Sequence, residues 1–390
     1  MILLPILVRA LAALPGLSGD DPITAWSSDV TIRPVSEMQD RHVIHAYFNH
    51  SPESPDGRWV LFYTSATPEG HTGEIRILER STGKETLVAG NVTVEDAHRT
   101  ACQQWVNGGK TIVYHNCRDR RWVVVAVEMA TLKATIMASD YQIGIGSPTE
   151  KRVPIHGCHW NPGAHRDLDL VDVETGEIRT AVTMERVRQE YDAWLSGKFG
   201  PGETSIFFPV LSPDGKRAFF KIARGGGGDD FRSSKASLRE GKIVYDLENG
   251  HFVRMYPQWG HPSWHPDSKR IFEKGNYLMD PDTGQTRRMV LTPSDHPSVS
   301  PDGRLFVTDA DVSRRENAKP GDWAIVVGSM ERNESALVHQ FNSSQGAKSW
   351  RRSHPHPAFS PDGRRLYFNA SSGPWTRLYV AEARRASSPK

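Results

Sequence analysis

Three histidines in a repeated pattern, with a fourth beside the last of them, could bind a metal ion. His261, His296 and His356 each precede the proline of a Pro-Asp turn by five residues, in the stretches HPSWHPD, HPSVSPD and HPAFSPD. His354 lies two residues before His356, and residues two apart in an extended segment point to the same face. Imidazole nitrogens suit divalent transition metals such as Mn, Fe, Co and Zn, and the flanking prolines stiffen the backbone. A lone histidine would more simply cap a strand, but three in one register predict a shared site.

The turns that follow these histidines belong to a repeat that runs through the chain. Proline presets the first corner of such a turn, while Asp and Gly supply local hydrogen bonds and tolerance of positive φ, so each copy predicts a tight hairpin. Five copies are clear and two are weaker, WVNGGKTIVYHN from residue 105 and HWNPGAHRDLDLVDVETG from residue 159. The seven predicted turns are at Pro55, Asn107, Asn161, Pro213, Pro266, Pro301 and Pro361.

The spacing of these turns predicts the fold class. Intervals of 35 to 60 residues are typical of propeller blades, and a second Thr-Gly or Asn-Gly turn follows in several repeats, as in ERSTGKETLV and DLENGHFVRM. Each repeat therefore reads as four antiparallel strands, which predicts an all-β, seven-bladed β-propeller around a central channel. The strand before each Pro-Asp turn would be the innermost one. We therefore expect His261, His296 and His356 to converge at one end of the channel.

Basic and polar residues cluster near the same turns. His98 and Arg99 precede the second predicted turn. Lys221 stands just before a Gly-rich segment at 223–241 that we expect to be a flexible loop, and Arg239 stands near the end of that segment. Three more residues, His159, His165 and Arg166, surround the third predicted turn. Solvated loops and ion pairs would explain each segment alone. Together they predict a cationic rim that binds an anionic substrate.

Length and composition set the remaining bounds. The 390 residues are 37% hydrophobic and 24% charged, with a net charge of +2, which describes an ordinary globular protein and gives no signal for nucleic acid. Three cysteines without a C-x-x-C pair support neither a disulfide framework nor a zinc knuckle. We expect a single propeller over 21–390, with a short helical insertion near 183–200 and a segment before residue 40 that completes a blade. The sequence leaves the oligomeric state open.

Residues 1–20 predict a leader segment. They are apolar over a stretch too short for a membrane span but suited to a secretory signal, which would direct the protein to the periplasm or the medium. Arg9 within the stretch and the lack of a basic start leave a cytoplasmic location as the alternative.

The HPHP motif ahead of an SPDG hairpin in the last repeat resembles the oligogalacturonate lyases, and the repeated SPDG hairpins resemble the wider group of TolB-like propellers. The first resemblance implies that His296, His354 and His356 bind Mn²⁺, with Zn²⁺ or Ca²⁺ as alternatives. The family has a glutamine ligand three residues before the first motif histidine, where this chain has Arg351. Arginine cannot ligate a metal, so we expect Arg351 to contact substrate and the fourth ligand to be His261 or a water.

The same resemblance implies a metal-dependent lyase that cleaves an acidic oligo- or polysaccharide by β-elimination. The family also uses a histidine base and an arginine, and position in the chain suggests His261 and Arg232 for these catalytic roles. The alternative is a non-catalytic, TolB-like propeller that serves as a binding scaffold, because fold does not imply function. A propeller of the prolyl-oligopeptidase kind is excluded, since no G-x-S-x-G motif or hydrolase domain follows.

Overall fold

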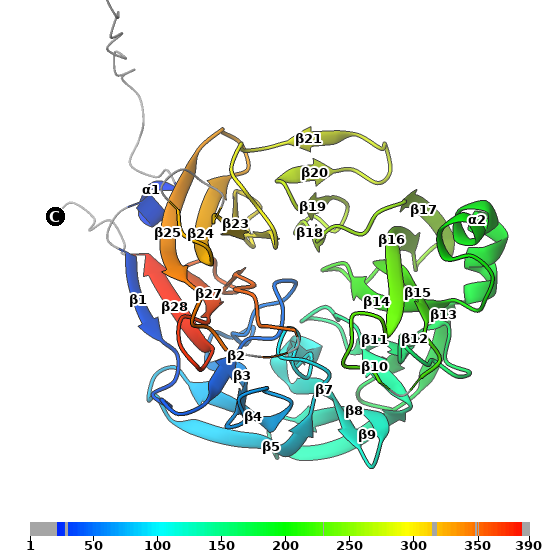
Figure 1. The fold of residues 1–390 in the computed structure, drawn as a ribbon, viewed down its shortest axis with the longest axis horizontal. Helices are drawn as coiled ribbons and strands as arrows, with labels where there is room; N and C mark the ends of the chain where they lie inside the picture. The colour runs from blue at the N-terminus through cyan, green and yellow to red at the C-terminus, as the bar shows by residue number, and fades with distance from the viewer. Residues whose placement is uncertain are drawn as a thin grey trace, which may run out of the picture.

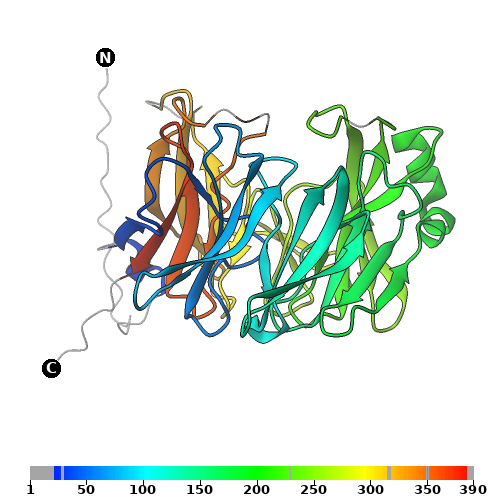
Figure 2. The same ribbon diagram turned by 90° about the horizontal axis from the view of Figure 1, so that it is seen from below.

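The chain folds into a ring of seven antiparallel sheets around a central channel (Figure 1). The computed structural model describes residues 22–27, 30–228, 230–313, 318–347, 349 and 351–383, and the predicted leader at 1–20 lies outside them. Each sheet has four strands in the described residues, and Figure 2 shows the strands running between the two ends of the ring. The prediction of a seven-bladed β-propeller is confirmed.

The strands of each blade follow one another from the channel outward. The first two blades are β2 (His42–Ile44), β3 (Trp59–Ser65), β4 (Thr72–Glu79) and β5 (Glu85–Thr93), then β6 (Gln104–Val106), β7 (Thr111–Arg118), β8 (Arg121–Glu128) and β9 (Lys133–Ser139). The third and fourth are β10 (Tyr141–Ile143), β11 (Arg152–Gly157), β12 (Leu168–Asp172) and β13 (Ile178–Val182), then β14 (Ser205–Leu211), β15 (Arg217–Gly225), β16 (Ser237–Asp246) and β17 (His251–Tyr256). The fifth and sixth are β18 (Ser263–Trp264), β19 (Ile271–Glu273), β20 (Tyr277–Met279) and β21 (Thr286–Arg288), then β22 (Ser298–Val299), β23 (Leu305–Asp311), β24 (Asp322–Ser329) and β25 (Ser335–Asn342). The seventh combines β26 (Ala358–Phe359), β27 (Arg365–Ala370) and β28 (Arg377–Ala383) with β1 (Val30–Pro34).

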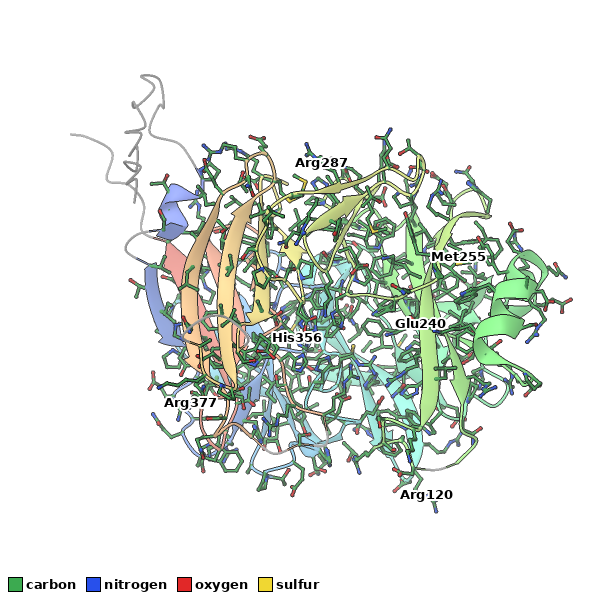
Figure 3. The ribbon with its side chains drawn as sticks, turned by 45° about the horizontal axis from the view of Figure 1, so that its top comes forward. Arg120, Glu240, Met255, Arg287, His356 and Arg377 are labelled. Carbon is green, nitrogen blue, oxygen red and sulfur yellow. The ribbon has the colours of Figure 1, made fainter. Side chains whose placement is uncertain are left out.

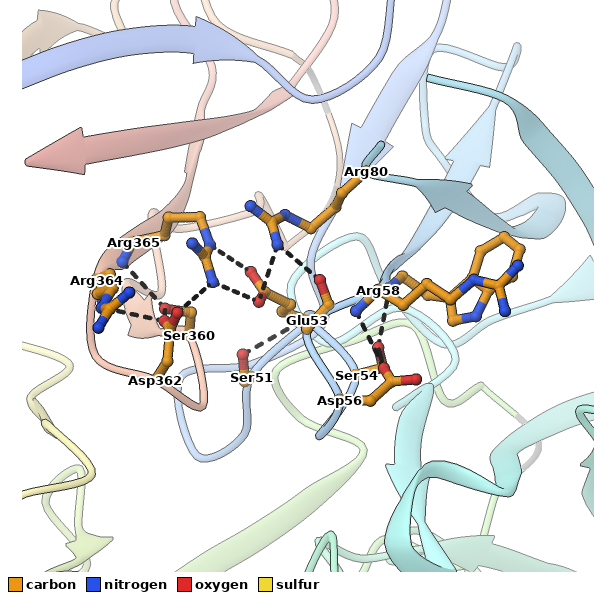
Figure 4. A network of polar contacts seen from close by, with 12 residues as sticks. Ser51, Glu53, Ser54, Asp56, Arg58, Arg80, Ser360, Asp362, Arg364 and Arg365 are labelled. Carbon is orange, nitrogen blue, oxygen red and sulfur yellow. Dashed lines mark hydrogen bonds and ion pairs between the residues drawn. The ribbon is translucent and has the colours of Figure 1, made fainter. Parts of the chain in front are cut away.

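The two ends of the described chain close the ring together. Strand β1 pairs antiparallel with β28, so the segment predicted to complete a blade does so in the seventh. A buried polar network joins this blade to the first (Figure 4). Arg365 donates two hydrogen bonds of 2.8 Å to the carboxylate of Glu53, which also accepts from the Tyr367 hydroxyl at 2.5 Å. Arg80 lies 3.6 Å from the same carboxylate.

The Ser-Pro-Asp-Gly turns share one internal hydrogen bond. In the first blade the Ser54 hydroxyl donates to the Asp56 carboxylate at 2.5 Å, and the same bond recurs at 2.6 Å in the fourth, sixth and seventh blades. The third blade departs from the pattern: its innermost hairpin joins β10 to β11 through the sequence SPTEKR at 147–152. The turn predicted at Asn161 is therefore wrong, because that residue lies between β11 and β12. Thr149 stands where the other copies have Asp, which hides the true turn in the sequence.

The helical insertion is present as predicted. Helix α2 (Met184–Phe199) begins after Thr183, whose hydroxyl accepts from the Arg186 N–H at 3.2 Å, and ends before Gly200 at φ 66°. Its buried face packs in a core shared with the fourth blade. A short helix α1 (Thr24–Ser27) precedes β1, and a 3₁₀ turn η1 (Asn107–Gly109) forms the second hairpin. In the described part of the chain no helix is long and apolar enough to cross a membrane.

The Gly-rich segment is more ordered than predicted. The strands β15 and β16 extend into 223–241 from both sides and pair as far as Gly225 with Ser237. The pairing leaves only the tip of the segment as a loop, so the prediction of a flexible loop over the whole of 223–241 is wrong. This hairpin places Arg239, on β16, over Phe207 near the end of the channel that carries the histidines.

The segment after β2 runs through the channel and is tied to several blades. The His45 N–H donates to the Asn369 side chain of the seventh blade at 2.9 Å, and the Asn49 amide donates to the Pro262 carbonyl next to the fifth blade at 2.8 Å. Tyr47 and Phe48, between these ties, are both buried. The channel centre is therefore packed with aromatic side chains, which form the floor of the site described next.

Candidate active site

Four imidazoles meet at one end of the channel. His98, His296, His354 and His356 each offer a ring nitrogen, and these nitrogens all lie within 4.8 Å of one another. His296 and His356 stand two residues before the innermost strands β22 and β26, as the shared register predicted. His98 comes from the segment between β5 and β6, which joins the first blade to the second and is far in sequence from the other three histidines. Figure 3 shows His356 near the middle of the ring.

Several ring nitrogens of this cluster have no hydrogen-bond partner in the part of the chain that the structure describes. Among the described residues, Nε2 of His98, Nε2 of His296, Nδ1 of His354 and both nitrogens of His356 are buried without a hydrogen-bond partner. Burial lowers the pKa of His354 to about 4 and lowers the pKa values of His98 and His356 well below the usual range. These three imidazoles are therefore neutral near pH 7, which is the form that binds metals.

A buried carboxylate organises two of the four histidines. Asp309, on β23, accepts hydrogen bonds from the His296 N–H at 2.9 Å and from His296 Nδ1 at 3.0 Å, and it also accepts from the His356 N–H at 3.1 Å. The ring hydrogen bond fixes Nδ1 as the protonated nitrogen and leaves Nε2 free to bind a metal. Asp309 was missed in the sequence, although it is the last residue of the SPDGRLFVTD repeat.

The backbone is strained beside this cluster. His356 has φ 46° and Phe208, on β14, has φ 51°, values that residues with a β-carbon adopt at a cost of about 1–3 kcal/mol. Tyr47 packs against His356 with ring centres 4.6 Å apart, and Phe48 packs against His296 at 5.2 Å. These two floor residues also escaped sequence analysis, since they follow no turn motif. The close packing of Tyr47 and Phe48 offsets the cost of the strained backbone and holds the imidazoles in one arrangement.

His261 stands next to the cluster and has its own carboxylate. Its ring centre is 4.2 Å from that of His296, and its Nδ1 lies 2.9 Å from Asp295, which also binds the Lys274 ammonium at 2.5 Å. Burial lowers the pKa of His261, and the hydrogen bond that its Nδ1–H donates to Asp295 opposes that shift. With Nδ1 bound to Asp295, Nε2 is the nitrogen left to accept a proton.

Three cations gather around two phenylalanines near the cluster. Arg99 packs over Phe208 at 4.8 Å, while Lys221 and Arg239 lie 5.3 and 5.9 Å from the ring centre of Phe207. Burial, with the neighbouring arginines, lowers the pKa of Arg239 to about 10 and lowers that of Lys221 well below its usual value. Positive charge is therefore crowded here, which favours binding of an anion.

Two acidic residues balance part of this charge. Glu95 lies 3.4 Å from Arg99, and Asp96 lies 3.4 Å from Arg351, whose side chain is about one-third exposed. Asp96 also accepts from the N–H groups of His98 and Arg99, so it fixes the turn that carries both. Four cations against two carboxylates leave this region net positive.

Four other residues predicted for the site lie away from the imidazole cluster. His159 uses both ring nitrogens for structure, bonding Ser237 at 2.6 Å and Glu95 at 3.0 Å. Arg166 pairs with Glu203, and His165 packs on Tyr141. The Arg232 guanidinium lies over Phe231 and donates to the Val94 carbonyl at 3.0 Å.

Two of these residues share a separate cavity. Arg232 and His165 line a space of about 650 Å³ with Trp122, Trp160 and Phe231. The predicted grouping of the third turn with the histidine cluster failed because that turn is not an innermost hairpin. The placement of Arg232 follows from the β15–β16 hairpin, whose tip reaches over the second and third blades.

Comparison with known proteins gives the class of the fold. No family model matches the chain, and no curated protein matches it. Among solved structures, a chain of the mitotic checkpoint complex has a TM-score of 0.53 at 12% identity, with 97% of this chain and 98% of that chain covered. At this identity the likeness shows the propeller fold alone.

Two solved oligogalacturonate lyases are more similar. One, solved in complex with manganese, has a TM-score of 0.64 at 17% identity and covers 91% of this chain and 93% of its own. The other, from Vibrio parahaemolyticus, has a TM-score of 0.63 at 15% identity, with coverage of 93% and 96%. The fold is therefore that of an oligogalacturonate lyase-like propeller, as the HPHP motif predicted.

The residues of the cluster fit a divalent metal ion. The donor atoms are buried and convergent, and among the described residues the orphaned nitrogens would otherwise leave hydrogen-bonding capacity unused in the interior. His296, His354 and His356 can hold such an ion, while the adjacent His261 keeps a free nitrogen for proton transfer. The arrangement thus combines imidazoles that could hold a metal ion, a histidine with a free ring nitrogen and a cationic surface.

Proposed function

We propose that the protein is a metal-dependent lyase that cleaves a uronic-acid-containing oligo- or polysaccharide by β-elimination. The observation that carries this proposal is the group of buried imidazoles with free nitrogens beside the hydrogen-bonded pair of His261 and Asp295. The likeness of the fold to oligogalacturonate lyases supports the same class. A propeller that only binds ligands would gain nothing from unsatisfied imidazoles in its interior.

The reaction requires removal of the weakly acidic C5 proton next to the sugar carboxylate. In our proposal His296, His354 and His356 hold a divalent ion, for which the resemblance to the lyases by itself suggests Mn²⁺. When bound, this ion supplies positive charge that stabilises the carboxylate as negative charge builds on it. His261 accepts the C5 proton at Nε2, and Asp295 stabilises the resulting imidazolium.

Removal of the C5 proton leads to cleavage of the C4–O bond. The electron pair of the C5–H bond forms a C4–C5 double bond, the C4–O bond breaks, and the departing oxygen takes a proton from water. The hydroxide that remains takes the proton from the His261 imidazolium, which regenerates the base and the water. The products are an unsaturated uronate and a free hydroxyl group. No oxidant or reductant is needed.

The cationic residues supply recognition of an acidic glycan. Arg99, Lys221 and Arg239 crowd positive charge around Phe207 and Phe208, and Arg351 adds a part-exposed guanidinium next to the cluster. Electrostatic attraction of this kind favours a carboxylated sugar chain over a neutral one. We assign carboxylate recognition to Arg351 in place of Arg232, because the partners of Arg232 belong to the neighbouring cavity.

A spectroscopic assay tests the proposal. The protein is incubated with a panel of uronate glycans, with and without EDTA, and the absorbance of the unsaturated uronate is followed. We expect an increase with at least one substrate and its loss on chelation. No increase on any substrate would contradict the lyase proposal and favour the alternative of a binding propeller.

Substitution of the base separates catalysis from metal binding. His261→Ala should lower kcat by about 10²–10⁴-fold, the usual contribution of a general base, with metal content unchanged. His251→Ala, which removes an exposed histidine on β17, is the matched control and should leave kcat unchanged. A His261→Ala variant with full activity would contradict the assignment of the base.

The location of the protein is part of the same proposal. An acidic polysaccharide is met outside the cytoplasm, which agrees with the leader predicted at residues 1–20. Cell fractionation should then find the protein in the periplasm or medium. Mass spectrometry should show that its N-terminus has been shortened. An intact cytoplasmic chain would contradict export and point to short oligosaccharides as substrates.

A further inference from the structure

His98 differs from the other three histidines of the cluster in its origin. His296 and His356 belong to the H-P-x-x-x-P-D pattern and His354 lies two residues before it, whereas His98 reaches the cluster from the 94–103 segment between the first and second blades. Its ring centre lies 4.7 Å from that of His354 and 4.5 Å from that of His356. It is 2% exposed, so solvent does not account for its free nitrogen.

The hydrogen bonds of His98 fix which nitrogen faces the cluster. Nδ1 lies 3.1 Å from the Arg352 carbonyl, which can only accept, so this nitrogen carries the proton. Nε2 is then the lone-pair nitrogen, and it is buried without a partner among the described residues. His296 has the same arrangement, with Nδ1 bound to Asp309 and Nε2 free. A hydrogen bond on the far nitrogen is the usual support for a metal-binding histidine.

The segment that carries Arg351 also secures His98. Arg351 pairs with Asp96 at 3.4 Å, and Asp96 accepts the N–H groups that begin the turn bearing His98. The next residue, Arg352, supplies the carbonyl that orients the His98 ring. The chain just before HPHP therefore provides no ligand itself but positions one from another blade.

We infer that His98 is the fourth protein ligand, so that a divalent ion is held by four imidazoles. This inference rests on the metal site of the proposed function and goes beyond it, because it predicts metal preference. Neutral imidazole suits Zn²⁺ and Co²⁺, whereas Mn²⁺ and Ca²⁺ favour sites with carboxylate or carbonyl oxygen. The cluster therefore selects Zn²⁺ or Co²⁺ over Mn²⁺ and Ca²⁺.

Titration with Co²⁺ tests the ligand set directly. When Co²⁺ is added to the metal-free protein, the strong visible absorption of four-coordinate Co²⁺ should appear. Zn²⁺ should displace the bound Co²⁺, while equimolar Mn²⁺ should not. In His98→Ala the absorption should weaken, and Zn²⁺ affinity should fall by more than the roughly 10–100-fold that loss of an outer partner costs. His71→Ala, which removes an imidazole outside the cluster, is the control and should bind as the original protein does.

Two further readouts keep the test decisive. Thermal unfolding with and without Zn²⁺ reports whether each variant folds and how much the metal stabilises it, and the shift should shrink in His98→Ala. If His98→Ala does not fold, His98→Gln keeps the size of the side chain and should still weaken the Co²⁺ absorption. An unchanged spectrum and affinity in a folded His98 variant would overturn the inference, as would a preference for Mn²⁺ over Zn²⁺.

The outcome is separable from that of the lyase proposal. A four-imidazole spectrum in a protein that cleaves no uronate glycan would support the ligand assignment and overturn the lyase. Metal-dependent lyase activity together with a Co²⁺ spectrum that is unchanged in His98→Ala would support the lyase proposal and overturn the assignment of His98 as a ligand.

Discussion

One carboxylate oxygen of Asp309 accepts two hydrogen bonds from His296, from the main-chain N–H at 2.9 Å and from ring Nδ1 at 3.0 Å. The other oxygen accepts the His356 N–H at 3.1 Å, so one buried residue sets the positions of two proposed ligands. Loss of such a partner typically costs 10–100-fold in metal affinity. We therefore expect Asp309→Asn to weaken Zn²⁺ binding by about 10–100-fold, measured by competition with a chelator.

A neighbouring residue provides the control for this prediction. Asp311 lies two residues further along β23, is exposed and bonds only to Ser313 among the described residues. Asp311→Asn makes the same chemical change without touching the histidines and should leave metal affinity unchanged. Equal affinities for the two variants would show that Asp309 does not support the site.

The repeat made most of the fold predictable. Pro-Asp turns and their spacing gave seven blades, and the shared register of His261, His296 and His356 placed them together because equivalent positions converge in a ring. Asp309 and His98 were harder to assign, since their roles depend on contacts between different strands or blades. No local pattern distinguishes a carboxylate that orients a ligand from one that faces solvent. The third hairpin was missed for a local reason, because Thr149 replaces the aspartate that marks the other turns.

The cations around Phe207 should control substrate binding more than catalysis. Lys221 lies over the Trp259 ring at 4.1 Å and is crowded by Arg99 and Arg239. Lys221→Met removes the charge but keeps the length of the side chain, so we expect KM for an acidic glycan to rise about tenfold, equal to roughly 1.4 kcal/mol. The value of kcat and the metal content should stay close to those of the original protein.

The salt dependence of KM provides a second check on Lys221. Attraction of a charged substrate weakens as salt screens it, so the slope should be smaller in Lys221→Met. Lys216→Met, at an exposed lysine paired with Glu248, is the control. A fall in kcat with unchanged KM would instead place Lys221 in the chemical step.

The buried polar network around Glu53, which joins the first and seventh blades, should contribute strongly to the free energy of unfolding. Glu53 is fully buried and binds Arg365 through two hydrogen bonds (Figure 4). Breaking a buried pair typically costs about 3–5 kcal/mol, and the carboxylate that Arg365 would keep as a partner, that of Asp362, is part-exposed. Glu53→Gln should lower the free energy of unfolding by that order. Glu79→Gln, at the exposed Arg58 pair, should change it by less than about 1 kcal/mol.

Buried histidines outside the cluster of four imidazoles should make the propeller sensitive to acid. Burial lowers the pKa of His50 to about 4 and the pKa values of His115 and His156 to about 3, from an ordinary value near 6.5. Above pH 6.5 these rings are neutral in both states and the stability is fully present. Below pH 6.5 the unfolded chain binds protons that the folded chain does not, so stability falls as pH drops toward 4.

The expected slope is about 1.4 kcal/mol per pH unit for each such histidine. Thermal unfolding at pH 7.0, 6.0 and 5.0, with EDTA to remove metal, measures it. His115→Gln removes one titrating ring while its amide oxygen can still accept the Ile143 N–H that His115 Nδ1 binds at 3.3 Å, so the slope should become shallower in this variant. A melting temperature that did not change between pH 7 and 5 would contradict the prediction, because it would mean that these rings are protonated as readily in the folded chain as in the unfolded one.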